Sequence, residues 1–240
     1  MKTLLLKVNF DKSVAIKITL YFVLAFGISY CLNLLSKLLP VYGIKWVLNV
    51  GCGPFLSALL VSFLYKTPLT LTLFSKTAWI RQIEFVGLGL FFIGTIINNI
   101  LVGNTDYSLI FLWSVYALYY TLLEELGWRV FLGKELRKYS FLTVVIVSTV
   151  LWFTWHYSFP NRLTVANPFQ FLGLIAAGSA GMAALYRQTK SWLLVALTHA
   201  LVNVNPPSLP TLVIFLVIIL GLLRLHEAKN KRSNADILQL

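Results

Sequence analysis

Long apolar runs separated by short polar connectors make up most of the 240-residue chain. A helix needs about 20 largely apolar residues to cross the hydrocarbon core of a bilayer. Asn203, Asn205 and the pair Pro206 and Pro207 interrupt the last long run and favour a turn, which separates a short seventh span from the eighth. The predicted spans cover residues 14–35, 45–65, 83–103, 108–133, 141–158, 169–186, 190–204 and 208–225.

These runs predict helices, because the bilayer core offers no water to satisfy free backbone groups. We therefore expect an all-α fold, a polytopic transmembrane helical bundle of about eight spans. No long linker or repeat divides the chain, so residues 1–240 are predicted to form a single domain. Within the sixth span, Gly173, Ala177 and Gly181 place small residues four apart and predict close approach of a neighbouring helix.

The distribution of basic residues supports this span count through the positive-inside rule. Lys37, Lys45 and Arg162 fall in connectors on one side, Arg129 falls within a span, and the remaining sixteen of the 20 Lys and Arg residues fall on the other side. An incorrect count would scramble this asymmetry. We therefore predict cytoplasmic N- and C-termini in a multi-pass protein of the cell membrane, specifically of a bacterial cytoplasmic membrane.

Composition agrees with a membrane environment. Apolar residues make up 58% of the chain and charged residues 12%, with a mean hydropathy of +0.80, whereas soluble domains are about 25% charged. The net charge of +12 does not indicate nucleic-acid binding, because the basic residues lie in separate connectors rather than on one face. They instead orient the protein in an anionic bilayer, so the lipid bilayer is the first predicted partner.

The fourth span carries three ionisable residues, each of which costs about 2.5–3.5 kcal/mol on insertion scales and so suggests a function. Residues four apart on a helix nearly superimpose, so Glu125 can pair with Arg129. Glu124 points about 100° away and lacks this partner. A buried carboxylate takes up a proton more readily than one in water, which is what a general base requires. We therefore interpret Glu124 as the reactive group and Glu125 as its support.

Two later spans carry histidines. His156 follows Trp152 by one turn near the end of the fifth span, and a satisfied packing histidine is the simpler reading of this pair. His199 and Asn203 lie four apart and face one side of the seventh span. They form either a hydrogen-bonded helix contact or two donors to one substrate oxygen, which would make an oxyanion hole.

Residues that act together must lie at similar depths in the membrane. A rise of 1.5 Å per residue places Glu124 roughly 15 Å, His199 roughly 14 Å and His156 roughly 22 Å from the inner end of their spans. On this estimate His156 lies too far out to meet the other two.

The three motifs together resemble those of the CAAX-protease and bacteriocin-processing family of intramembrane endopeptidases, also called the Abi family. That family carries Glu-Glu-x-x-x-Arg, aromatic-x-x-x-His and His-x-x-x-Asn on separate spans, and the order is the same here, within about residues 108–204. The resemblance implies that Glu124 and His156 activate water while His199 and Asn203 stabilise the tetrahedral intermediate. The supporting positions are Glu125, Arg129 and Trp152, the last of which is usually phenylalanine in the family.

A metal is the main alternative for this chemistry. One carboxylate and two imidazoles satisfy a zinc site, so Glu124, His156 and His199 would be the ligands if Zn²⁺ is present. The His-Glu-x-x-His pairing of soluble zinc proteases is absent from the sequence, and an amide beside His199 suits an oxyanion better than a cation. We therefore favour a glutamate-type mechanism without a cofactor.

The predicted function is hydrolysis of a peptide bond in a membrane-associated or secreted peptide, or in a membrane protein. The resemblance implies bacteriocin processing or self-immunity for a compact member, and we expect prenylated CAAX substrates to be less favoured. A non-catalytic membrane partner or immunity protein is the first alternative. An ion-coupled transporter is a further alternative, although the sequence shows no inverted repeats or paired broken helices.

Overall fold

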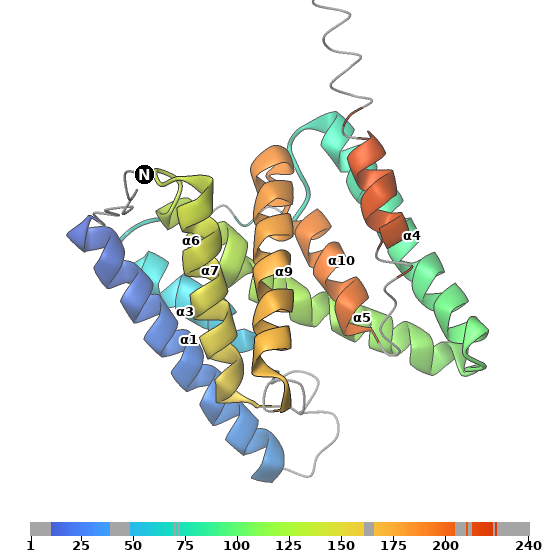
Figure 1. Cartoon of the computed structure of the whole chain (residues 1–240), viewed down its shortest axis with the longest axis horizontal. Coiled ribbons are helices and arrows are strands. Elements are labelled where there is room, and N and C mark those ends of the chain that lie inside the picture. The colour runs from blue at the N-terminus through green and yellow to red at the C-terminus, as the bar shows by residue number, and fades with distance from the viewer. Residues whose placement is uncertain are drawn as a thin grey trace, which may run out of the picture.

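The computed structural model describes the central part of the chain as helices joined by short connections, without strands among the described residues (Figure 1). The described residues are 11–38, 49–69, 71, 73–160, 166–204, 210, 213–222 and 224. The turn predicted at residues 205–207 and both predicted cytoplasmic termini lie outside these ranges.

The helices follow the apolar runs of the sequence. In chain order they are α1 (Lys12–Leu38), α3 (Cys52–Leu64), α4 (Ala78–Leu101), α5 (Tyr107–Glu125), the π-helical η1 (Leu126–Phe131), α6 (Leu132–Glu135), α7 (Phe141–Trp155), the 3₁₀ helix η2 (His156–Ser158), α9 (Pro168–Thr189) and α10 (Trp192–Asn203). A further apolar helix covers Val213–Leu222.

Within the described residues, five helical segments are long and apolar enough to cross a membrane, which confirms the predicted polytopic helical bundle. The predicted second, seventh and eighth spans instead contain shorter apolar helices, Cys52–Leu64, Trp192–Asn203 and Val213–Leu222. For α10 the physical reason is burial, because every residue from Leu193 to Leu201 is buried within the protein. A helix surrounded by protein does not have to match the thickness of the bilayer.

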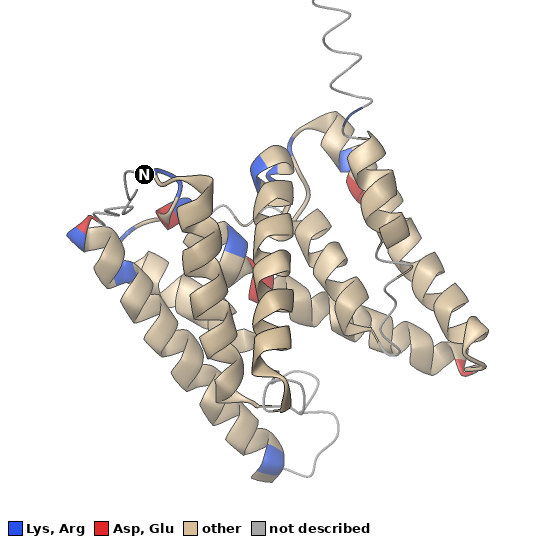
Figure 2. Ribbon diagram, viewed as in Figure 1, with Lys and Arg blue, Asp and Glu red and all other residues tan. Residues whose placement is uncertain are grey.

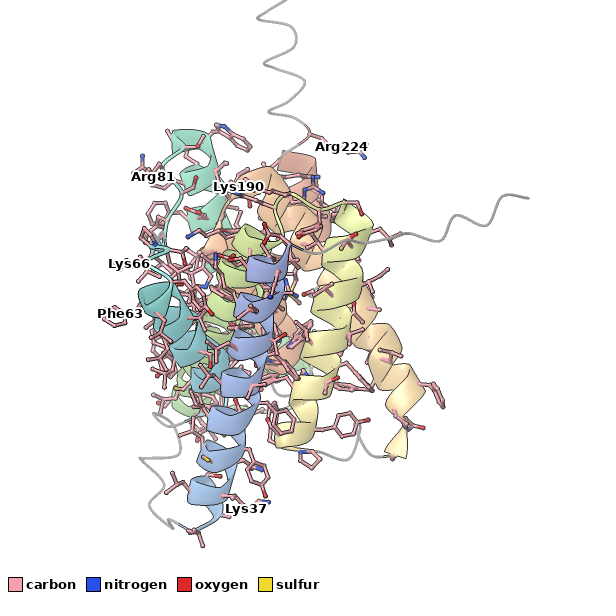
Figure 3. All side chains as sticks on the ribbon, turned by 90° about the vertical axis from the view of Figure 1, so that its left-hand side faces the viewer. Lys37, Phe63, Lys66, Arg81, Lys190 and Arg224 are labelled. Atoms are coloured by element: carbon pink, nitrogen blue, oxygen red, sulfur yellow. The ribbon has the colours of Figure 1, made fainter. Side chains whose placement is uncertain are left out.

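The basic residues gather toward one end of the bundle. Figure 2 shows most of the blue Lys and Arg positions on the ribbon toward the end of the bundle where α9 finishes, which we call the basic end. Figure 3 places Arg81, Lys190 and Arg224 toward this end and Lys37 at the opposite end. The arrangement matches the charge asymmetry of the sequence and is the one expected of a multi-pass protein with its basic end at the inner face.

Side-chain caps fix the first turn of each helix that carries a motif. In α5, α7 and α10, the backbone N–H of the third helical residue donates to the side chain of the residue just before the helix, at 3.0, 3.1 and 3.0 Å. The accepting side chains are those of Asp106, Ser140 and Ser191. Each cap satisfies one backbone donor that the helix geometry leaves free, and such caps stabilise a helix by about 1 kcal/mol. The local sequence therefore sets where these three helices begin.

Close packing at one glycine anchors η1. A Cβ atom on Gly127 would lie 2.7 Å from the Cβ of Pro54 in α3 and would also meet the Tyr21 hydroxyl in α1. The ring of Tyr21 packs against Trp128 and Phe131, with centroids 5.5 and 4.7 Å apart. Only glycine allows three segments to meet this closely, so the stretch that follows the two glutamates is held between α1 and α3.

The predicted small-residue contact in the sixth span is wrong. Gly173 and Gly181 have open space around them in α9. The glycine that packs against another helix is Gly178, on a different face, where a Cβ would lie 3.2 Å from the Trp152 ring of α7. Spacing alone did not distinguish the face directed at α7 from an exposed face.

Candidate active site

A cavity of about 290 Å³ opens between α5, the end of α7 and α10, and all four predicted catalytic residues line it. They come from three helices that are far apart in the sequence. The remaining lining residues are mainly aromatic or small. The full lining comprises Trp113, Tyr116, Ala117, Tyr120, Glu124, His156, Phe159, His199, Asn203 and Val204.

Glu125 connects α5 to α10 beneath this cavity. Its Oε1 accepts a hydrogen bond from His199 Nδ1 at 2.8 Å, and its Oε2 lies 3.3 Å from Arg129 Nε, in the pair predicted from the four-residue spacing. The second contact is an ion pair rather than a directed hydrogen bond, because its geometry leaves both atoms without a hydrogen-bond partner. Since Glu125 occupies Nδ1, the nitrogen of His199 left for substrate is Nε2.

Glu124 has a different set of partners, as its direction on the helix predicted. Trp152 Nε1 donates a hydrogen bond to Glu124 Oε2 at 3.1 Å, and the Tyr120 side chain forms a second hydrogen bond to the same carboxyl group. Glu124 is 1% exposed. Two donors therefore hold one buried carboxyl group at the edge of the cavity.

Besides its hydrogen bond to Glu124, Trp152 contacts both histidines and Arg129. Its ring lies 5.2 Å from the His199 ring and 5.8 Å from the His156 ring, measured between centroids. The Arg129 guanidinium carbon lies 4.9 Å from the Trp152 centroid on another side. The indole thus fixes the relative positions of Glu124 and the two histidines, a larger role than the packing ring that the sequence suggested.

His156 is the first residue of η2, directly after α7 ends. Its Nδ1 lies 2.7 Å from the backbone oxygen of Trp152. A carbonyl oxygen only accepts, so Nδ1 carries the proton and Nε2 of the neutral ring is an acceptor. Aromatic rings of Trp155, Phe159 and Phe171 surround the imidazole at 4.9–5.4 Å between centroids, which limits its rotation.

The depth estimate that separated His156 from Glu124 is wrong, because both residues line one cavity. The estimate assumed that all spans run parallel to the membrane normal. Figure 1 shows α5 steeply inclined to α7 and α9, so its residues change depth much more slowly than 1.5 Å per residue. Helix tilt depends on packing partners and is not encoded in hydropathy.

Two contacts of the site were missed by sequence reasoning. Tyr120 precedes Glu124 by four residues, and this i, i+4 spacing was a usable signal for their contact. Thr121 was not detectable in this way, because its hydroxyl bonds to the backbone oxygen of Ala196 at 3.0 Å on a distant helix. That bond ties α5 to α10 beside the two glutamates.

A zinc site formed by Glu124, His156 and His199 is the alternative that the sequence left open. In the described part of the chain, no three His, Cys, Asp or Glu side chains are grouped as metal ligands. Zinc-bound histidines also donate a ring N–H to a carboxylate, as His199 does to Glu125. Metal dependence through Glu124, His156 and His199 therefore stays a prediction for experiment.

Comparison with known proteins agrees with the motif assignment. No curated protein and no solved structure shows significant similarity to the chain. Residues 106–205 match the family described as type II CAAX prenyl endopeptidase, Rce1-like. This segment includes all three motifs and every residue that lines the cavity. Residues 106–205 thus carry the pattern of the Rce1-like family, which confirms the predicted resemblance to the CAAX-type intramembrane proteases.

Proposed function

We propose that the chain is an intramembrane endopeptidase whose catalytic residues are Glu124, His156, His199 and Asn203. The observation that carries the proposal is their meeting in one cavity of about 290 Å³ between three helices. Charged and polar residues inside a membrane protein cost free energy of insertion, so their presence there indicates a function. A cavity also admits the water that hydrolysis consumes.

The first step is activation of water. Glu124 accepts a proton from a water molecule, and the acceptor nitrogen Nε2 of His156 orients that water through a hydrogen bond. The water oxygen attacks the scissile carbonyl carbon, and the carbonyl oxygen becomes an oxyanion. Glu124 stays aligned for this transfer because Trp152 and Tyr120 hold its carboxyl group.

The second step is stabilisation and collapse of the intermediate. The Asn203 amide and Nε2–H of the protonated His199 ring donate to the oxyanion, and Glu125 supplies the negative charge that stabilises this imidazolium. Glu124 then delivers its proton to the leaving nitrogen as the C–N bond breaks. The products are a carboxylic acid and an amine, the acid then releases its proton to the amine or to water, and Glu124 returns to its ionised starting state.

The lining of the cavity suggests an apolar substrate. Trp113, Tyr116 and Tyr120 follow one face of α5 toward Glu124, and Phe159 lies on the side of η2. Such a surface favours apolar side chains beside the scissile bond. We infer a membrane-associated peptide, with bacteriocin processing or self-immunity in a bacterial cytoplasmic membrane as the biological setting. Because the matched family is described by CAAX prenyl endopeptidases, prenylated peptides belong in the test beside unmodified ones.

The decisive experiment compares two glutamate variants reconstituted in liposomes. Glu124→Gln preserves shape but removes the base, and loss of a general base lowers the rate by about 10²–10⁴-fold. Glu135→Gln is the matched control, because Glu135 pairs with Lys17 at 3.2 Å and does not line the cavity. Cleavage of a panel of prenylated and unmodified peptides is followed by mass spectrometry, and folding by thermal unfolding in detergent.

The expected result is loss of cleavage in Glu124→Gln alone, with both variants folded. Cleavage retained by folded Glu124→Gln would exclude Glu124 as the base, whereas no cleavage of any peptide by the natural protein would favour a non-catalytic membrane partner. A parallel assay after treatment with a chelator tests the mechanism. Full activity after chelation agrees with the glutamate-type mechanism, whereas loss that added Zn²⁺ restores would assign a metalloprotease.

A further inference from the structure

A second cavity, of about 170 Å³, lies toward the basic end of the bundle and shares no residue with the first. Residues of η1, α6, α7 and α9, together with the turn after α6, enclose it. Figure 3 shows one of them, Lys190, near that end. The lining comprises Trp128, Arg129, Gly133, Leu136, Arg137, Tyr139, Val144, Ser148, Ala183, Tyr186, Arg187 and Lys190.

The charge of this lining has one sign. Arg129, Arg137, Arg187 and Lys190 contribute four cations, and none of the described lining residues is Asp or Glu. Arg137, Arg187 and Lys190 are exposed, and none of these three forms an ion pair within the described part of the chain. Arg187 and Lys190 lie 5.4 and 5.9 Å from aromatic ring centroids, contacts that leave their charge uncompensated. The cavity therefore presents concentrated positive charge.

Three buried lining residues also carry hydrogen-bonding atoms without partners. These atoms are Arg129 Nη1, Ser148 Oγ and Trp128 Nε1, on residues that are 2%, 2% and 1% exposed. The nitrogens can only donate, and the hydroxyl can donate as well. Buried donors without acceptors are rare in folded proteins and call for a ligand or water that accepts. Positive charge and unused donors around one cavity both indicate an anion.

We propose that this cavity binds a phosphate-type anion, either the headgroup of an anionic phospholipid or free phosphate. A cavity of 170 Å³ far exceeds the about 10–15 Å³ that one water molecule requires, so a phosphate group fits. Arginine fits phosphate oxygens with two parallel hydrogen bonds. Basic pockets between transmembrane helices at the inner face are positioned to meet lipid headgroups. This inference does not depend on the proposed protease activity.

The anion site has a structural link to the first cavity. The Arg129 guanidinium lines the second cavity and also pairs with Glu125, which in turn holds His199. Arg129 Nη2 donates to Met182 Sδ at 3.4 Å, whereas Nη1 has no acceptor. An anion bound to Nη1 satisfies this donor and so fixes the guanidinium in place. Occupancy should therefore raise the thermal stability of the whole bundle.

The test uses the full chain in neutral detergent, with either phosphatidylglycerol or inorganic phosphate added. The triple variant Arg137→Gln, Arg187→Gln and Lys190→Gln removes the exposed cations of the cavity. The matched control Lys76→Gln, Arg81→Gln and Lys138→Gln removes the same charge from exposed positions outside the cavity. Native mass spectrometry counts bound lipid, and thermal unfolding measures stabilisation at constant ionic strength.

We expect the cavity variant to bind phosphatidylglycerol at least about tenfold more weakly than the control, because each nearby cation adds about 1 kcal/mol, or about fivefold, to headgroup binding. Ser148→Ala, which changes no charge, should weaken binding severalfold. Stabilisation by phosphatidylglycerol alone assigns a lipid headgroup, and equal stabilisation by inorganic phosphate assigns a free anion. Equal responses of the cavity and control variants, or no response of the natural protein to either ligand, would overturn the proposal.

Discussion

Replacing Trp152 by phenylalanine tests how Glu124 is held. The substitution keeps an aromatic ring, the usual residue of the resembling family, but removes the N–H that donates to Glu124 Oε2 at 3.1 Å. Both side chains are buried, so no bulk water replaces the lost donor. A hydrogen bond to a charged group contributes about 1.5–3 kcal/mol. Each 1.36 kcal/mol of transition-state stabilisation changes the rate tenfold.

These magnitudes predict that kcat/KM falls about ten- to hundredfold in Trp152→Phe, if alignment of the carboxylate contributes fully to the transition state. The assay is cleavage of the best peptide from the liposome panel. Trp192→Phe is the matched control, because Trp192 donates at 2.9 Å to the backbone oxygen of Leu122 and does not line the cavity. Both variants should lose some stability, but only Trp152→Phe should lose activity.

A Trp152→Phe protein with activity within twofold of the natural chain would refute this reasoning. It would show that the indole N–H does not align Glu124 and that the ring alone provides what the site needs. Activity lost equally in Trp192→Phe would instead show that both effects arise from general destabilisation. Comparing kcat/KM with the unfolding midpoint for each variant separates these outcomes.

Two further predictions concern Tyr120 and Gly178, which contact Glu124 and Trp152 respectively. Tyr120→Phe removes the second hydrogen bond to Glu124. A hydrogen bond to a charged group contributes about 1.5–3 kcal/mol, which predicts a ten- to hundredfold fall in kcat/KM. Combined with Trp152→Phe, the loss should differ from the product of the single effects, and strict multiplicativity would contradict a shared action on one carboxylate. Gly178→Ala places a Cβ 3.2 Å from Trp152 and should reduce activity by shifting the indole. Gly181→Ala, in open space on the same helix, should retain activity and gain up to about 1 kcal/mol of stability, as measured by thermal unfolding.

The sequence predicted the features that depend on local periodicity. Hydropathy located the helical runs, and the charge distribution predicted which ends gather basic residues. The i, i+4 rule predicted the Glu125–Arg129 pair and the different direction of Glu124. All these predictions use spacing along one helix, which the sequence states directly. In the described part of the chain, three of the eight predicted spans contain shorter helices. For α10 the reason is that hydropathy does not distinguish a lipid-facing helix from one covered by protein.

Features that depend on contacts between helices were not predictable in this way. Figure 1 shows α5 inclined to α7, and Glu124 of α5 lines the same cavity as His156. The π-helical η1 widens the turn directly after the two glutamates. Short π-helical segments are frequent at functional sites but lack a composition signature. Here Gly127 lets η1 pack against α1 and α3, and packing of this kind appears only in three dimensions.

Trp152 is a residue for which the sequence and the structure each supply part of the explanation. The sequence identified an aromatic residue one turn before His156, where the resembling family usually has phenylalanine. The structure adds that this indole contacts His156, His199 and Arg129 and donates to Glu124. A phenylalanine could make the ring contacts but not the hydrogen bond. The departure from the family's usual residue therefore supplies Glu124 with a donor, and Tyr120 supplies the other.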